Sequence, residues 1–273
     1  MKMRKQVVLL AIGLIVAGFV VVVMKPRLLS KPVQHLLFAD WMVEEERRTG
    51  PAIGQLGGVP VSIPRDYAHF LEYDGDPGFM EQRKGARPER TFASSIRAFG
   101  FEVHYPDMRV PSSNTVEERR NSGIYTSMWL RVGVSSGQDY GSDGKNAPGV
   151  YVRGMKDGFK KYKYERTGVN EYGLETYVPI NVDEAARQKG RGAADFADYN
   201  VYYHTDATGR VDTYIECHND SHEAAPCKQK FNMFPEMAAH ISVSYRRGLL
   251  KDWREIQSSV SKVILGFEAN TKN

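Results

Sequence analysis

Cysteine is scarce in this chain of 273 residues, which contains only Cys217 and Cys227. Because no cysteine precedes position 217, a lipid-modified N-terminal cysteine is excluded as a membrane anchor. Catalytic motifs are scarce too, since the chain has neither the metalloprotease pattern H-E-x-x-H nor the dinucleotide-binding pattern G-x-G-x-x-G. We therefore expect a protein that is not an enzyme, with no catalytic, cofactor-binding or metal-binding residues. A catalytic site assembled from residues far apart in the sequence is the alternative.

The body of the chain also lacks an excess of positive charge. The 37 Lys and Arg and the 33 Asp and Glu residues give a formal net charge of +4. Six of those basic residues and none of the acidic ones lie in the first 31 positions, which leaves 31 basic against 33 acidic residues, a net charge of −2. Such a body lacks the positive field that nucleic-acid binding requires, so that class is excluded.

One long apolar run stands near the N-terminus, at residues 7–24, "VVLLAIGLIVAGFVVVVM". As a helix it would rise roughly 27 Å, close to the thickness of a bilayer's hydrocarbon core. The following "MKPRLLSK" has no small-residue cleavage pattern, which favours an uncleaved transmembrane anchor over a cleaved signal peptide. We predict a cytoplasmic tail at 1–6, the anchor at 7–24, a membrane-proximal segment at 25–55 and a periplasmic α+β domain at 56–273.

The orientation of the anchor is predicted from the cysteines, because basic residues flank the apolar run on both sides. Cys217 and Cys227 border a polar loop between two strand-like runs, so a disulfide would close that hairpin. Disulfides persist in oxidising compartments. We therefore predict a single-pass protein of the bacterial inner membrane with its soluble domain in the periplasm. A zinc site that adds His218 and His222 to the cysteines, or two free thiols, are the alternatives.

Alternation of apolar and polar residues predicts a body made mainly of strands. The hairpin signal is clearest in "NVYYHTDATGRVDTYIEC", where a turn at 206–209 offers Gly209 for a left-handed position. In "FKKYKYE", Lys161 and Lys163 are expected on a solvated face and Tyr162 and Tyr164 on the other; a nucleic-acid-binding stripe is the alternative. Further strands are predicted in "GGVPVSIP", "SIRAFGFEVHYPD" with a bulge at Gly100, "GIYTSMWLRVGVSSG", "GVYVRGMKDGFKKYKYERTG", "LETYVPINV" and "HISVSYRR".

The C-terminal run "LLKDWREIQSSVSKVILGF" predicts an amphipathic helix, and "HLLFADWMVEEERRTG" predicts a shorter helix ending at Gly50. Together these elements predict an α+β fold: an N-terminal transmembrane helix, a mainly antiparallel β domain and a C-terminal amphipathic helix. The apolar stripe of the C-terminal helix comprises Leu249, Leu250, Trp253, Ile256, Val260, Val263, Ile264 and Phe267.

The run "EYDGDPGF" at 72–79 concentrates three carboxylates. A calcium loop of the EF-hand type needs oxygen ligands at alternating positions, but Gly78 stands where the third ligand should be. Pro77 and Gly78 instead suit the two central positions of a type II turn. We interpret the run as a structural turn, with a cation site or a partner contact as alternatives.

Three stretches, "GGVPVSIPRDYAHFLEYDGDPGF", "FGFEVHYPDM" and "AAHISVSYRRGLLKDWREIQSSVSKVILGF", resemble proteobacterial envelope proteins encoded beside type VI secretion lipase effectors. The resemblance implies a membrane-anchored periplasmic immunity protein that binds and inhibits a type VI secretion antibacterial lipase effector, without a cofactor and with unknown partner-binding residues. Exposed loops at 74–78, 139–149 and 218–226 are reasonable places for contact. A non-catalytic bitopic structural or assembly component of an envelope or secretion complex is the alternative.

Overall fold

The computed structural model describes residues 50–77, 85–86, 88–123, 125–140, 147–157, 163–180 and 199–269. The predicted tail and anchor, and the predicted helix before Gly50, lie outside the described residues, as do Gly78 and the pair Lys161 and Tyr162. Within the described residues, no helix is both long and apolar enough to cross a membrane. The chain divides into two units, and the fold below belongs to the unit formed by Gly50–Asp74 and Arg90–Asn273.

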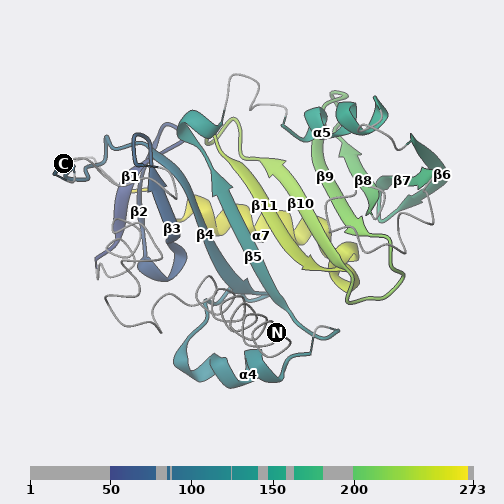
Figure 1. The fold of residues 1–273 in the computed structure, drawn as a ribbon, viewed down its shortest axis with the longest axis horizontal. Helices are drawn as coiled ribbons and strands as arrows, with labels where there is room; N and C mark the ends of the chain where they lie inside the picture. Colours follow the sequence, from purple (N-terminus) through teal and green to yellow (C-terminus); the bar gives the residue numbers. More distant parts are fainter. Residues whose placement is uncertain are drawn as a thin grey trace, which may run out of the picture. The chain divides into compact units, whose positions relative to one another are not determined.

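A nine-stranded antiparallel sheet dominates this unit, in the order β3-β4-β5-β11-β10-β9-β8-β7-β6 (Figure 1). Strand β11 pairs with β5, so the last strand of the chain joins the early meander β3–β5 to the later meander β6–β11. The prediction of a mainly antiparallel sheet is confirmed. Its strands are β3 (His69–Tyr73), β4 (Ile96–His104), β5 (Trp129–Ser135), β6 (Lys163–Glu171), β7 (Leu174–Ile180), β8 (Tyr199–Thr205), β9 (Val211–His218), β10 (Pro226–Asn232) and β11 (His240–Arg246).

A separate hairpin precedes the sheet and consists of β1 (Ala52–Leu56) and β2 (Val59–Ile63). Strand β1 thus begins inside the stretch assigned to the membrane-proximal segment. Gly57 and Gly58 both have positive φ at the turn, as a two-residue hairpin loop requires. A side chain at Gly57 would lie 2.5 Å from the backbone of Ala238, so glycine also permits close packing there.

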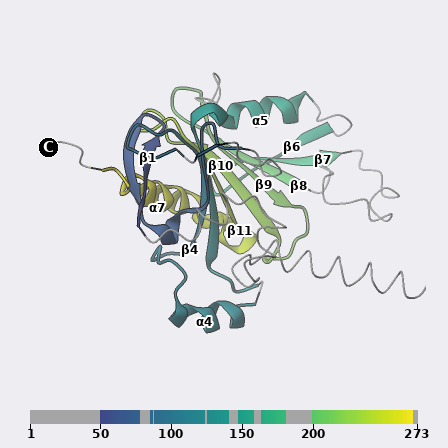
Figure 2. The same cartoon turned by 60° about the vertical axis from the view of Figure 1, so that its left-hand side comes forward.

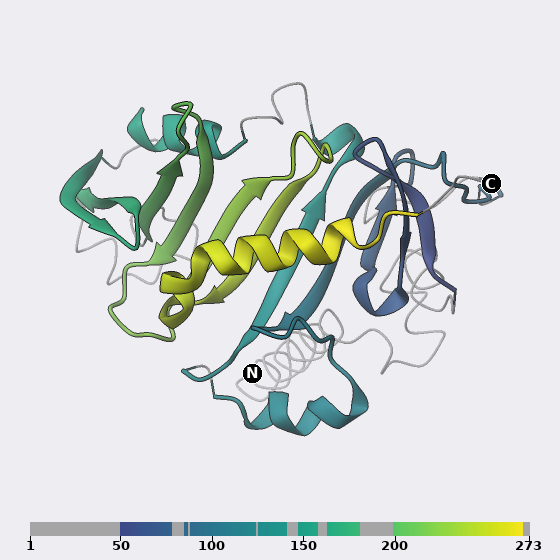
Figure 3. The ribbon, with the colours of Figure 1, turned by 180° about the vertical axis from the view of Figure 1, so that it is seen from behind.

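The C-terminal helix α7 (Trp253–Leu265) runs across one face of the sheet, behind it in Figure 1 and in front of it in Figure 3. A 3₁₀ turn, Arg247–Asp252, precedes it, so the α-helix begins later than predicted. The predicted stripe lies in the main core, with Val263 partly buried and the other seven residues buried. Alternating inward residues of the strands, such as Phe101, Val132 and Val243, supply the other side of this core.

A second helix, α5 (Ala147–Lys156), packs on the opposite face of the sheet (Figure 2). The sequence predicted a strand here, and that prediction is wrong. Val152 and Met155 of α5 are buried against Tyr203 of β8 and Tyr214 of β9. These four side chains belong to a small second core. Helix α5 contacts β9 and β10, so it leaves the other half of this face uncovered by any described helix.

The bulge predicted at Gly100 is also wrong, because β4 pairs with β5 in continuous register from Ala98 to His104. The irregularities lie in the pairing of β4 with β3, between His69 and Glu72 and between Glu72 and Tyr73. There Phe70 has a φ of +53° and a side chain exposed to solvent. At the first shift the extra residue therefore belongs to the edge strand β3, where bulges are common, and at the second it belongs to β4.

The predicted hairpin of β8 and β9 and the disulfide between β9 and β10 are both confirmed. Gly209 has a φ of +82° in the β8–β9 turn, where the Asp206 carboxylate accepts hydrogen bonds from the backbone nitrogens of Thr208 and Arg210. Cys217 and Cys227 face each other in register and are disulfide-bonded, with their Cα atoms 4.0 Å apart. The bond joins two central strands of the sheet.

Candidate functional site

Figure 1 looks onto the sheet face opposite α7. Over β4, β5 and β11 this face carries mainly small and polar residues. We call this region the open face. Gly100, Gly133 and Ser242 stand side by side in register across these three strands. Glycine inside a strand weakens it and often marks a place where another chain approaches closely. A side chain at Gly133 would lie 2.8 Å from the Ser242 hydroxyl, so part of this glycine's role is local packing.

A groove of about 400 Å³ lies where the open face meets α5. Its floor comes from β5, β10 and β11, and its wall from the first turns of α5. The groove is lined by Gly133, Ser135, Asp139, Pro148, Tyr151, Lys228, Lys230, Phe231, Asn232, His240, Ile241 and Ser242. Most of these side chains offer hydrogen-bond donors or acceptors, which is typical of a recognition surface rather than an apolar cofactor site.

The wall of the groove is held by interactions of Lys230 on β10. Its Nζ atom lies 3.7 Å from the centre of the Tyr151 ring and 3.3 Å from Oε1 of Glu216. The Tyr151 ring also stacks on Tyr214, with 5.2 Å between the ring centres. Lys230 and Glu216 are each less than one fifth exposed. This cation–π and ion-pair arrangement fixes the start of α5 on the sheet.

His240 fixes the end of the groove where β11 begins. Its Nε2 lies 3.1 Å from the carbonyl oxygen of Tyr140, to which it donates, and its ring stacks on the Tyr140 ring. Its Nδ1 contacts the side-chain amide of Asn232 at 2.6 Å. Burial lowers the pKa of His240, although the hydrogen bond to Tyr140 opposes this effect. His240 therefore anchors the backbone at Tyr140.

Two of the predicted contact loops have their bases next to this groove. The Asp74 carboxylate accepts hydrogen bonds from the Ser95 hydroxyl (2.6 Å) and from the backbone nitrogen of Gln138 (3.2 Å). Arg97 lies beside it and donates to Asp139 at 2.7 Å, which raises the pKa of the guanidinium. The loops at 74–78 and 139–149 thus begin side by side. Asp74 is engaged as an acceptor within the protein, which favours the structural interpretation of "EYDGDPGF".

The third predicted contact loop, 218–226, lies at the opposite ends of the strands. Its backbone is fixed by hydrogen bonds from Gly248 to Glu223 (2.9 Å) and from Arg247 to Ala225 (2.8 Å). The ring of His222 contacts Tyr125 edge-on. The zinc alternative is wrong, because both cysteine sulfurs are bonded to each other. The structure therefore does not bring the three loops together.

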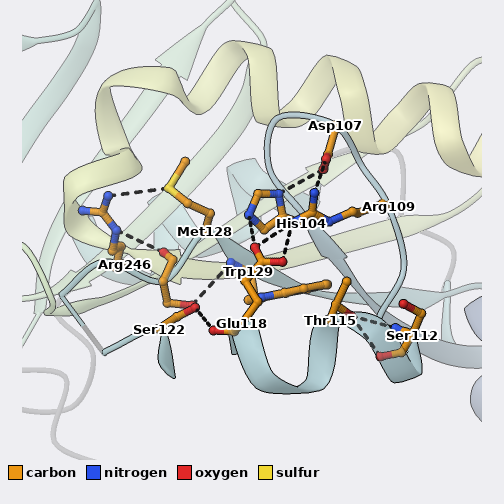
Figure 4. A network of polar contacts seen from close by, with 11 residues as sticks. His104, Asp107, Arg109, Ser112, Thr115, Glu118, Ser122, Met128, Trp129 and Arg246 are labelled. Carbon is orange, nitrogen blue, oxygen red and sulfur yellow. Dashed lines mark hydrogen bonds and ion pairs between the residues drawn. The ribbon is translucent and has the colours of Figure 1, made fainter. Parts of the chain in front are cut away.

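A polar network at that same end of the sheet contains His104 (Figure 4). Its Nδ1 lies 3.0 Å from Asp107, and its Nε2 lies 3.4 Å from Glu118 on α4 (Val116–Asn121). Arg109 donates to both carboxylates, at 2.9 Å to Asp107 and 2.6 Å to Glu118. Every charged group here has a partner, so the network holds α4 against the end of β4.

Residues 133–137, "GVSSG", fit the spacing of a G-x-S-x-G nucleophile motif, a match that the sequence analysis missed. Ser135 is the last residue of β5 and pairs in register with His240. Both ring nitrogens of His240 are already engaged, with Asn232 and Tyr140. Among the described residues, no hydrogen bond joins a serine hydroxyl to a histidine ring, and no three metal-ligating side chains gather.

The described residues define an antiparallel α+β protein with a polar groove beside a largely helix-free sheet face. No protein-family model matches the sequence, and no curated protein matches it. Among solved structures, Smlt3025, an immunity protein of the Stenotrophomonas maltophilia type IV secretion system, is similar with a TM-score of 0.49 and 16% identity. The match covers 81% of this chain and 94% of that one. The immunity role belongs to the Stenotrophomonas protein, and a similarity of this size assigns no role to the present chain.

Proposed function

We propose that this protein is an immunity protein, a non-catalytic inhibitor that binds an antibacterial toxin through the open face and its groove. The observation that carries the proposal is the preorganised groove, whose wall and end are fixed by Lys230 and His240. A surface that is already ordered loses little conformational entropy on binding, so more of the contact energy appears as affinity.

The toxin that we propose is a type VI secretion lipase effector, which the resemblance of the sequence supports. We also propose that residues 7–24 anchor the protein in the inner membrane and that its body lies in the periplasm. The Cys217–Cys227 disulfide supports an oxidising compartment. Tethering would keep the inhibitor near the lipids that the toxin attacks and so raise its effective concentration.

Co-expression tests the inhibitory role. Cells would produce a periplasm-directed type VI secretion lipase effector of the proposed kind, together with either the full-length protein or an empty vector. We expect survival only with the full-length protein, and co-purification of the two proteins from solubilised membranes. Equal killing in both strains would contradict the proposal. A structural component of a secretion complex would instead cause loss of secretion on deletion, with unchanged sensitivity to the lipase.

The location of the body is tested separately with a C-terminal alkaline phosphatase fusion, because this enzyme requires disulfides that form outside the cytoplasm. We expect an active fusion in the membrane fraction. An inactive fusion of full length would place the body in the cytoplasm and contradict the proposed topology, whatever the result of the co-expression experiment.

A further inference from the structure

The charges at the rim of the groove do not balance. Lys228 and Lys230 project from β10 on the same face, and the neighbouring strand β9 places one carboxylate, Glu216, beside them. Glu216 forms its ion pair with Lys230 at 3.3 Å, although Lys228 stands directly opposite it in register. Lys228 is exposed and forms no ion pair with any residue that the structure describes. This part of the rim has a surplus of one positive charge.

A surplus of positive charge also occurs on the other side of the open face. Glu102 of β4 is paired with two cations, Arg131 of β5 at 3.6 Å and Arg119 of α4. Arg131 has a side chain that is 78% exposed, and it lies in the same cross-strand row as Lys228, separated from it by Ser244. Four cations therefore face two carboxylates, although the body as a whole carries a net negative charge.

The remaining charged group of the groove does not offset this surplus. Asp139 is already bound to Arg97 at 2.7 Å. Burial lowers the pKa of His240, which disfavours its charged form. Lys230 is held below the Tyr151 ring, so its position is fixed and Lys228 is the cation available to a ligand. The electrostatic preference of the groove is therefore for a carboxylate.

We propose that the groove receives an acidic loop of the toxin, with a carboxylate of that loop paired with Lys228. This inference rests on the proposed function and specifies the chemistry of the partner. The exposed Tyr151 ring would pack against the loop, and Ser135 and Ser242 would offer hydroxyl groups on the floor. Gly133 lines the groove without a side chain, so the backbone of the loop would be able to approach the sheet there. The positive rim would steer an acidic partner and speed association at low salt.

Charge reversal at Lys228 tests the proposal. The full-length protein in detergent would be compared with Lys228→Glu and with Lys251→Glu, which makes the same change on the 3₁₀ turn before α7. We expect Lys228→Glu to weaken binding of the lipase roughly tenfold or more and to reduce its salt dependence. Lys251→Glu should remain within about twofold of the wild type. Unfolding midpoints of both variants would confirm that they are folded.

The outcomes separate this inference from the proposed function. If the wild type binds the lipase and Lys228→Glu binds equally well, the groove inference is overturned and the immunity role stands. If the wild type does not bind the lipase, the immunity role fails. Calorimetric titration with the peptides acetyl-Asp-Glu-Asp-amide and acetyl-Asn-Gln-Asn-amide then tests the groove inference by itself. Binding of the acidic peptide alone, lost in Lys228→Glu, supports the groove inference. Equal or absent binding of both peptides overturns it.

Discussion

The side-chain nitrogen of Gln229 on β10 lies 3.2 Å from the backbone carbonyl oxygen of Trp253, the first residue of α7. Gln229 is fully buried, and the same nitrogen donates to Gln257 one turn further along the helix (2.9 Å). Its carbonyl oxygen accepts from the Tyr245 hydroxyl at 2.9 Å. Strand and helix are thus joined by a satisfied polar network inside an otherwise apolar core, which fixes how α7 lies on the sheet.

Removing one donor from this network tests its contribution. Tyr245→Phe leaves the carbonyl oxygen of Gln229 buried without its partner, so we expect the free energy of unfolding to fall by about 1–3 kcal/mol. Urea denaturation followed by tryptophan fluorescence measures the change. Tyr125→Phe is the matched control, because that side chain is exposed, and it should change stability by less than about 0.5 kcal/mol. Equal effects of the two variants would show that the network adds no stability.

The disulfide is expected to stabilise the fold by reducing the conformational entropy of the unfolded chain. It closes a short loop, with a sequence separation of 10, so the chain-entropy account gives about 2–3 kcal/mol. The double variant Cys217→Ser, Cys227→Ser should therefore have a free energy of unfolding that is lower by about 2–3 kcal/mol, measured by denaturant titration. Thiol labelling of the denatured wild type should detect two groups only after reduction. Two reactive thiols before reduction would contradict the bond.

Strand positions were predictable from the sequence because one face of each strand is buried, which imposes an alternating pattern. Leu130, Val132 and Val134 follow that pattern in β5. Helix α5 was not predictable from local preference, since it contains Pro148, two glycines and β-branched residues that favour other structures. Its helical form is stabilised by tertiary burial of Val152 and Met155, which outweighs weak local propensity.

The groove could not be predicted, because its parts lie about one hundred residues apart in sequence. Ser135 and His240 become neighbours only through the pairing of β5 with β11, and no local signal specifies that pairing. The same holds for Tyr151 and Lys230, which meet only because α5 folds back over β10. The disulfide was predictable, since two cysteines flanking one hairpin leave a single intramolecular partner for each.

Acidification should destabilise the protein through His240. Burial lowers its pKa in the folded state below the ordinary value of about 6.5 that holds in the unfolded chain. As the pH falls, the unfolded chain therefore takes up the proton first. The contribution of His240 to the free energy of unfolding is retained above about pH 6.5 and declines below it. Urea midpoints measured between pH 7.5 and 5 should fall less steeply in His240→Gln, which keeps a donor for Tyr140. Parallel pH profiles would exclude His240 as the cause.

Asp74 and Gly137 should act as one unit in holding the bases of the two loops together. Alanine at position 74 removes the acceptor for Ser95 and Gln138, so we expect a loss of about 1–2 kcal/mol in unfolding free energy. Alanine at position 137 would place its Cβ 2.5 Å from the Asp74 carboxylate, at a φ of +53° that strains any side chain. Since the clash needs Asp74, the double variant should lose less stability than the sum of the single losses.

Calcium distinguishes this structural role of Asp74 from the cation-site alternative. Because both carboxylate oxygens of Asp74 already accept hydrogen bonds from within the protein, millimolar calcium should leave the unfolding midpoint of the wild type unchanged. Thermal unfolding with calcium and with the chelator EDTA provides the measurement, and Asp74→Asn provides the matched variant. A midpoint that rises with calcium in the wild type, but not in Asp74→Asn, would show instead that the acidic run binds a cation.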